Sequence, residues 1–209
     1  MNEPLASLAI AAIAGGANAA VEQQALSDFI TAIQSADDSV RGPAWQGAEQ
    51  FGADAVEPLA QLMATVDMES ARAANRALWK IVRHAGRPGA ATERNAVATK
   101  LVSLLRKSRT DIRREMLWML SEIGDDKAVP TIASLLSDKD LRDDARAALE
   151  RIPGKKSLAA LRSALSTASA DFKQAIAVSL RVRGEKISKY PSQKLVPTKQ
   201  TNVRPVSAA

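Results

Sequence analysis

The stretch "TDIRREMLWMLSEIGDDKAVPTIASLLSD", residues 110–138, contains two apolar patterns of helical period on either side of a Gly-Asp-Asp turn. Pro130 opens the second pattern, and proline suits the first turn of a helix because its missing N–H would have no partner there. Gly124 lies where the first helix should end, since glycine adopts a left-handed cap conformation without strain. The stretch therefore predicts a pair of antiparallel helices.

This pattern recurs along the chain. A basic residue is followed eleven residues later by glycine in three places, at Arg41, Arg113 and Lys173. Two further stretches resemble these, which makes five basic anchors with spacings of 31, 41, 29 and 31 residues: Arg41, Arg72, Arg113, Arg142 and Lys173. One helix pair cannot bury its own apolar stripe, whereas stacked pairs form a continuous core. We therefore expect an all-α protein, an α-solenoid of about five antiparallel helix pairs.

Apolar residues recur at fixed distances from these anchors and predict the buried stripe of each first helix. They stand seven or ten residues after an anchor: Trp79, Leu120, Leu149, Leu180, Phe51, Val82, Ile123 and Ile152. Aromatic residues make up only 3% of the chain, so the core must consist mainly of Ala, Leu, Val and Ile. These residue types are consistent with closely packed helices.

The repeat and the composition divide the chain into three predicted segments. Residues 21–184 are the predicted solenoid, and residues 21–35 should cap it by burying Val21, Ala25, Phe29, Ile30 and Ile33. Residues 1–20 are rich in alanine and are predicted to be either disordered or a weak signal-like stretch. Residues 185–209 contain three prolines and five basic residues, which predicts a disordered basic tail.

The predicted location is cytoplasmic, with export as the alternative if residues 1–20 act as a signal. The first four residues contain Glu3 and no basic residue, whereas a secretory signal begins with positive charge. The sequence has no unbroken apolar run of about 18 residues, so no membrane crossing is expected.

The residue types present argue against an enzyme. The chain has no cysteine and a single histidine, His84. Disulfides, thiolate nucleophiles and zinc–sulfur sites are therefore excluded, and neither a histidine-rich metal centre nor a Ser-His-Asp relay is expected. We predict no catalytic residues, no metal and no cofactor.

The helix pairs resemble HEAT repeats, in the short bacterial form that also occurs in subunits of phycobilisome lyases. The similar features are the Asp-x-x-Arg and Asp-x-Arg helix starts, the "IGD" turn and the "AVPTIASLL" second helix, and they extend over residues 27–184. The resemblance implies a structural ladder between units formed by repeated charged residues: Arg41, Arg72, Arg113, Arg142, Asp38, Asp111 and Asp140. It also implies binding of other proteins, the usual role of such repeats.

Some HEAT-like proteins are DNA glycosylases that place Trp and Asp side chains on a basic concave surface. This chain has three tryptophans, Trp45, Trp79 and Trp118, all in predicted first helices. Tryptophans at helical spacing are usually packing residues. We therefore expect them in the core, with Trp45 the most exposed of the three.

The charges are unevenly distributed. Residues 1–70 have a net charge of −9, whereas residues 71–114 have a net charge of +10. The longest repeat spacing also falls here, and it predicts a loop insertion at residues 83–95. Insertions in solenoids often lie on the binding face. The candidate binding residues are the basic residues in and after this segment: Arg83, His84, Arg87, Arg94, Lys100, Arg106 and Lys107.

The leading hypothesis is a non-enzymatic scaffold that binds a protein partner, and the basic region favours an acidic one. A second hypothesis is a nucleic-acid-binding protein that uses the basic region 72–114, because phosphates attract the same side chains. A third, which rests on the family resemblance alone, is a lyase or chaperone subunit that acts on a chromoprotein.

Overall fold

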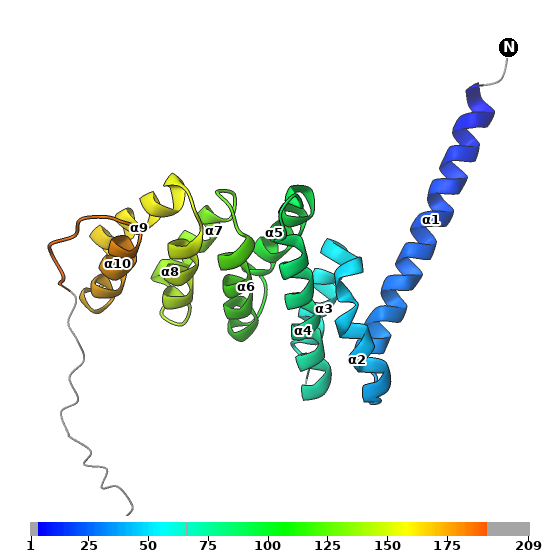
Figure 1. The fold of residues 1–209 in the computed structure, drawn as a ribbon, viewed down its shortest axis with the longest axis horizontal. Helices are drawn as coiled ribbons and strands as arrows, with labels where there is room; N and C mark the ends of the chain where they lie inside the picture. Colours follow the sequence, from blue (N-terminus) through cyan, green and yellow to red (C-terminus); the bar gives the residue numbers. More distant parts are fainter. Residues whose placement is uncertain (1–3, 66, 192–209) are drawn as a thin grey trace, which may run out of the picture.

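A computed structural model describes residues 4–65 and 67–191, and within these residues every regular element is a helix. Figure 1 shows the helices stacked one after another along the length of the molecule. In chain order they are α1 Pro4–Ile33, α2 Asp38–Gln46, η1 Ala48–Ala55, α3 Val56–Leu62, α4 Met68–Ala85, α5 Ala91–Leu104, α6 Thr110–Ile123, α7 Val129–Ser134, η2 Leu135–Ser137, α8 Arg142–Arg151, α9 Lys155–Thr167 and α10 Ala170–Val182.

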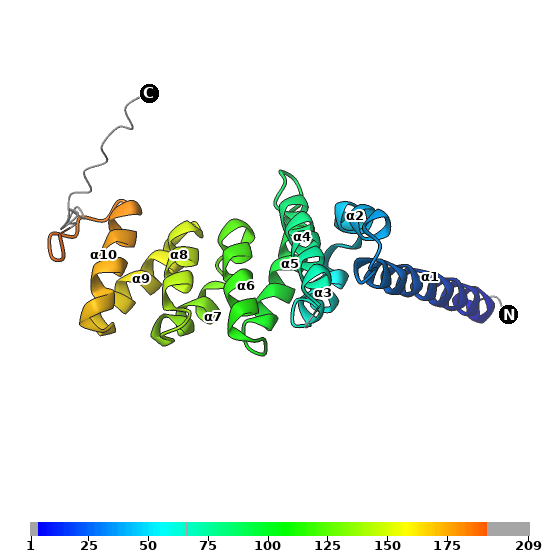
Figure 2. The ribbon, with the colours of Figure 1, turned by 90° about the horizontal axis from the view of Figure 1, so that it is seen from below.

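The helices form two rows. The first helices of the units, α2, α4, α6, α8 and α10, pack side by side in one row, and α3, α5, α7 and α9 form the other (Figure 2). The described residues thus contain four complete pairs and a fifth first helix, α10. The predicted all-α solenoid is confirmed.

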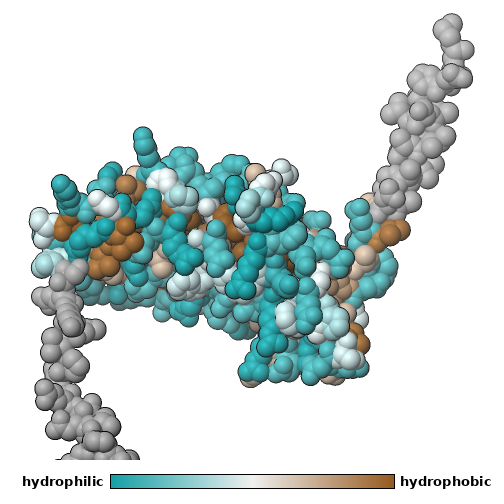
Figure 3. Space-filling view, in the orientation of Figure 1, coloured by the Kyte–Doolittle hydropathy of each residue, from teal (hydrophilic) through white to brown (hydrophobic). Residues whose placement is uncertain are grey.

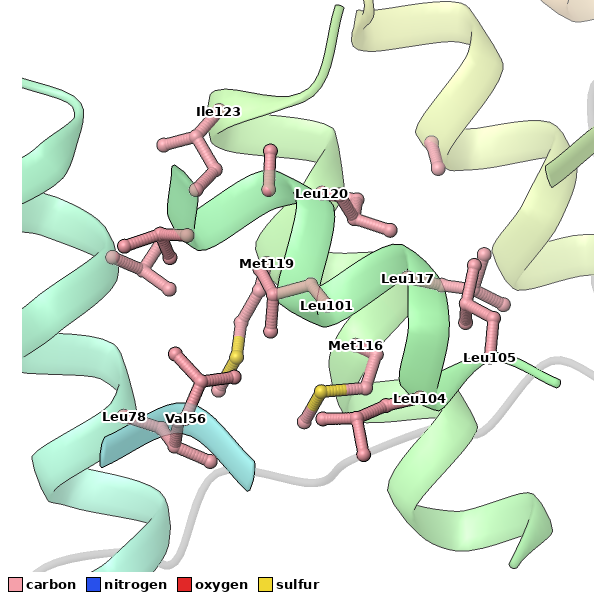
Figure 4. Close-up of a cluster of buried hydrophobic side chains, with 14 of the residues drawn as sticks. Val56, Leu78, Leu101, Leu104, Leu105, Met116, Leu117, Met119, Leu120 and Ile123 are labelled. Carbon is pink, nitrogen blue, oxygen red and sulfur yellow. The ribbon is translucent and has the colours of Figure 1, made fainter. Parts of the chain in front are cut away.

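The core runs continuously between the two rows. Figure 4 shows Val56 from α3, Leu101 from α5 and Met119 from α6 turned toward one another, while Leu120 from α6 extends to the other side. All four are fully or almost fully shielded from solvent. Most of the predicted stripe is buried with them, namely Val82, Leu120, Ile123, Leu149, Ile152 and Leu180. Phe51 is half-buried and stacks on Phe29, with ring centroids 4.2 Å apart.

Two glycines that were predicted to end helices do so in different ways. Gly184 has φ 86°, and the Glu185 N–H donates to the Leu180 carbonyl, which is a Schellman-type cap. Gly124, in contrast, has φ −67° and ψ 153°, so the left-handed conformation predicted there is wrong. Gly124 is instead constrained by space, because an added Cβ would lie 2.4 Å from the Leu120 carbonyl oxygen.

The long repeat spacing is taken up mainly by helix, and only residues 86–90 form a loop. Helix α4 has 18 residues against 14 in α6, and α5 has 14 against six in α7. The predicted loop at 83–95 is therefore mostly helical: Arg83 and His84 lie in the last turn of α4, and Arg94 lies in α5. Ala, Arg and Glu in this stretch favour continuation of both helices.

Helix α1 continues across the segment boundary predicted at residue 20, and Figure 1 shows it projecting away from the stack. Among its side chains from residue 19 on, Leu26, Phe29, Ile30 and Ile33 pack against the core. Val21 and Ala25 are exposed, which differs from the predicted capping face. Among the side chains described, those of α1 that touch the solenoid lie in its C-terminal turns.

The start of the segment predicted as a tail is attached to α10. Gln174 Nε2 donates to the Pro191 carbonyl at 2.5 Å, and Arg181 Nη2 donates to the Tyr190 carbonyl at 2.8 Å. Glu185 pairs with Arg162 of α9 at 2.5 Å. The rest of the predicted tail, residues 192–209, lies outside the described residues.

The surface is largely hydrophilic in the view of Figure 3, with apolar patches mainly over the C-terminal units. Among the helices in residues 4–65 and 67–191, none combines the length and the apolar character that a membrane crossing requires.

Candidate interaction surface

A groove of about 570 Å³ lies between α4 and the α2–η1 segment, and we call it the α4 groove. Helix α4 supplies most of its lining because it is amphipathic. Its Ala77, Leu78 and Ile81 enter the core, while the residues between them face outward. The lining residues are Trp45, Glu49, Asn75, Arg76, Trp79, Lys80, Arg83 and His84.

Two tryptophans wall the groove, and each has an arginine against its ring. The Arg76 guanidinium lies 5.6 Å from the Trp45 ring centroid, and that of Arg83 lies 5.2 Å from the Trp79 centroid. Such cation–π contacts hold both partners in place. Trp79 Nε1 also donates to Glu115 Oε2 of α6 at 3.3 Å, which links the groove to the next unit.

The structure refines the expectations about tryptophan. Trp79 is half-buried: it packs against the core and also lines the α4 groove, while the neighbouring Leu78 occupies the fully buried position. Trp118, and not Trp45, is the most exposed of the three, at 41%. Trp118 lies on the outer face of α6, where its Nε1 donates to Asp144 Oδ1 at 3.1 Å.

The α4 groove is rich in unneutralised positive charge. Within residues 4–65 and 67–191, no carboxylate lies within ion-pair distance of Arg76, Lys80 or Arg83. His84 Nε2 is 3.8 Å from Glu93 Oε2, a contact that is ionic only when the histidine is protonated. Three cations on successive turns of one helix repel one another, and an anionic ligand would relieve that repulsion.

Two acceptor atoms in the groove are shielded from solvent and unpaired. They are Glu49 Oε2 from η1 and Asn75 Oδ1 from α4, and no donor of the described residues reaches either. Buried polar atoms usually have a hydrogen-bond partner, so these two are exceptions within the described residues.

The seven predicted binding residues do not converge on one place. Only Arg83 and His84 line the α4 groove. Arg87 donates two hydrogen bonds to Glu93, at 2.6 and 2.8 Å, and these bonds hold the pKa of that carboxyl below its usual value. Its cation is therefore largely neutralised within the chain.

The remaining four belong to α5 and the turn after it, in the second row. Lys107 pairs with Glu57 of α3, and this hydrogen bond lowers the pKa of the Glu57 carboxyl. Arg106 Nη2 donates to Thr131 Oγ1 at 3.4 Å. Arg94 and Lys100 lie on α5 away from the α4 groove.

The groove also contains residues that sequence reasoning did not select. Arg76, Lys80 and Arg83 follow one another at helical spacing, so they were recognisable as one face of a helix. Trp45 and Glu49 come from a different unit, and no local pattern connects them with α4.

Two of the predicted ladder arginines contact an aspartate at or just before the first helix of the next unit. Arg113 Nη1 lies 3.6 Å from Asp138 Oδ2, just before α8. Arg142 Nη2 lies 2.6 Å from Asp171 Oδ2 of α10. Hydrogen bonds from Ser169 and Arg142 lower the pKa of the Asp171 carboxyl to about 2. These contacts join neighbouring units.

The other predicted ladder residues make local contacts. Arg41 pairs with Asp38 in α2 and donates to the Ser35 carbonyl at 2.5 Å. Arg72 pairs with Glu69 of its own helix at 2.8 Å. The two remaining aspartates contact arginines in other ways: the side chain of Asp111 pairs with Arg109, and the main-chain carbonyl of Asp140 accepts from Arg114.

Comparison with known proteins identifies the repeat. A family model described as HEAT repeats matches residues 98–181, that is, from α5 to α10. The match is to HEAT repeats in general and does not extend to the short bacterial type or to phycobilisome lyases. No curated protein sequence matches the chain.

Similar solved structures include two engineered proteins and a designed armadillo repeat protein, each with a TM-score of 0.40. The first engineered protein is 19% identical, over 75% of this chain and 78% of that one. The armadillo design is 16% identical, over 78% and 83%. The second engineered protein is 20% identical, over 75% and 47%. The family match and the stacked helix pairs described above show that residues 98–181 consist of HEAT repeats.

Proposed function

We propose that this protein is a non-enzymatic scaffold that binds an acidic protein partner in the α4 groove. The observation that carries the proposal is the set of three cations without carboxylate partners among the described residues, Arg76, Lys80 and Arg83, between two tryptophan rings. HEAT repeats commonly bind proteins, and the repeat is present here. An acidic segment of a partner would supply carboxylates to pair with these three cations.

The composition of the groove supports a protein ligand. Tryptophan and arginine are the residues that most often dominate binding energy at protein interfaces. The rings of Trp45 and Trp79 offer rigid apolar walls, and the cations offer charge-assisted hydrogen bonds to carboxylates. The positive field of residues 71–114 would also speed the approach of an acidic partner.

Nucleic acid is the second candidate, because phosphates would pair with the same cations. One observation makes it the less favoured. One face of each groove tryptophan is already covered by an arginine, which reduces the surface available for base stacking. The third hypothesis, a chromoprotein lyase subunit, gains support from neither the contacts nor the comparisons.

The test measures fluorescence anisotropy of a fluorescein-labelled peptide in which Glu and Thr alternate. Wild type is compared with a triple charge reversal in the groove, Arg76→Glu, Lys80→Glu and Arg83→Glu. The matched control places the same charge change on the other row: Arg94→Glu, Lys100→Glu and Arg106→Glu. We expect the groove variant to lose binding and the control to keep most of it.

Three other outcomes would contradict the proposal. If the peptide did not bind at low salt, the proposal of an acidic partner would be ruled out. Equal loss in both triple variants would show a general effect of net charge and no specific groove. If duplex DNA bound more tightly than the peptide, and only the groove variant lost this binding, nucleic acid would become the favoured ligand.

A further inference from the structure

The two ends of the stack carry opposite charges. Residues 19–46, which we call the acidic end, contain four acidic residues and one basic residue. Residues 152–191, the basic end, contain eight basic residues and two acidic ones. We infer that the acidic end of one copy binds the basic end of a second copy, so that the protein associates head to tail. This contact does not involve the α4 groove, so it is independent of the proposed function.

The acidic end has carboxylates without basic partners. Glu22, Asp28 and Asp37 are exposed, and within residues 4–65 and 67–191 no basic group lies within ion-pair distance of them. The one basic residue of this end, Arg41, is buried and pairs with Asp38. The surface of the acidic end is therefore negative, and α1 projects it away from the stack (Figure 1).

The basic end shows the reverse arrangement. Both of its carboxylates already pair with arginines, as described above. Lys173, Lys186 and Lys189 line a hollow of about 460 Å³ beside α10. In the described part of the chain no carboxylate lies within ion-pair distance of these three lysines. The cations of this hollow are thus available to carboxylates of another molecule.

The two ends cannot neutralise each other within one molecule. Figures 1 and 2 show α1 and α10 at opposite ends of the stack. Like charges repel one another within each end, and a surface of opposite charge relieves that repulsion. Every copy carries both surfaces in equal number, so a second copy fits either end.

Each end also offers an exposed apolar side chain. Val21 of α1 is 69% exposed and Val182 of α10 is 65% exposed, the two highest values for large apolar side chains among the described residues. Val21 adjoins Glu22, and Val182 lies four residues before Lys186. Protein interfaces bury apolar groups at the centre and keep charged groups at the rim. The valines therefore suit the same contact as the charges around them.

Head-to-tail contact joins two different surfaces, which has a consequence for assembly size. Each dimer keeps one free acidic end and one free basic end, so association should continue beyond dimers as the concentration rises. Exposed ion pairs are weak and are screened by salt, so the assembly should dissociate at high ionic strength.

The test is sedimentation velocity of the whole chain in about 0.01 M salt, where charges act over about 30 Å, and in about 1 M salt, where they act over about 3 Å. One variant reverses the acidic end, Glu22→Lys with Asp28→Lys. The other reverses the basic end, Lys186→Glu with Lys189→Glu. We expect wild type to associate at low salt and each variant to have a dissociation constant raised by about tenfold or more, because like charges then face each other.

Mixing the two variants should restore association, because each reversed end then meets a surface of opposite charge. Overall charge cannot produce this result, since each variant changes the net charge of +6 by four units and both remain positive. Restoration also shows that both variants are folded. The matched control, Arg94→Glu with Lys100→Glu on α5, should associate like wild type.

Four results would overturn the inference. They are wild type that stays monomeric at low salt, association that persists in both variants, and loss of association that mixing does not restore. The fourth is loss in the triple reversal of the α4 groove but not in the basic-end variant, which would place the acidic end of the second copy in that groove. Peptide binding to the α4 groove decides the proposed function separately.

Discussion

The contribution of a single apolar residue to stability depends on whether its side chain is packed between helices. Leu120 illustrates this, because it lies on the inner face of α6 and is completely buried between the rows (Figure 4). Val182, at the end of α10, is an apolar residue of similar kind but is 65% exposed. Leu120 and Val182 are both apolar, and they differ in whether other side chains cover them.

Leu120→Ala should lower the free energy of unfolding by about 2–5 kcal/mol, because it removes buried methyl groups and leaves a cavity between packed helices. Urea denaturation followed by circular dichroism measures the change. Val182→Ala is the control and should stay within about 0.5 kcal/mol of wild type. An unchanged midpoint for Leu120→Ala would contradict the packing described for α6.

At the scale of elements, helix ends are joined to neighbouring units by arginines. The clearest example is Arg183, which follows α10 and donates from Nη1 to the carbonyls of Leu149 and Ile152 at 2.9 and 2.8 Å. Its Nη2 donates to the Gly154 carbonyl at 2.9 Å. The last carbonyls of a helix have no partner within that helix, so this guanidinium caps α8 and fastens α10 to it.

Arg183→Ala should therefore destabilise the protein by about 1–3 kcal/mol, since hydrogen bonds from a charged donor are stronger than neutral ones. The loss should concentrate at the C-terminal unit, where limited proteolysis would cut α9 and α10 earlier than in wild type. Arg151→Ala, at an exposed position of α8, is the control. Equal proteolysis of the two variants would show that Arg183 does not hold the last unit.

At the scale of the molecule, stability should vary along the stack. In a solenoid each unit contacts only its neighbours, so central units are supported on both sides and terminal ones on a single side. Helix α6 packs against α4 and α5, which precede it, and against α8, which follows it, whereas the main neighbours of α1, namely α2, α4 and η1, all follow it in the chain.

Amide hydrogen exchange should follow this arrangement. We expect the slowest exchange in α6 and the fastest among the described helices in α1, at residues 19–25, where the side chains are exposed. Mass spectrometry of peptic fragments would measure both. Uniform protection from α1 to α10 would contradict a chain stabilised by nearest-neighbour contacts.

The sequence alone determined the fold because a solenoid is built from local patterns. The period of apolar residues, the anchor spacing and Pro130 predicted helix pairs, and Leu120 and Leu149 were correctly placed in the core. Helix formation and the choice of buried face depend on residues a few positions apart, so they can be read from the chain. The extra length after Arg72 was recognised, but most of it is helix, and the loop is confined to residues 86–90.

Only the tertiary structure decided the candidate site. Trp45 and Glu49 join Asn75, Arg76 and Trp79 in one groove because α2 and η1 stack on α4, and nothing near Trp45 in the sequence specifies that contact. Charge gives a second example. Arg83 and Arg87 are alike in sequence, yet Glu93 neutralises Arg87 and leaves Arg83 available, because electrostatic partners are chosen by distance in space and not along the chain.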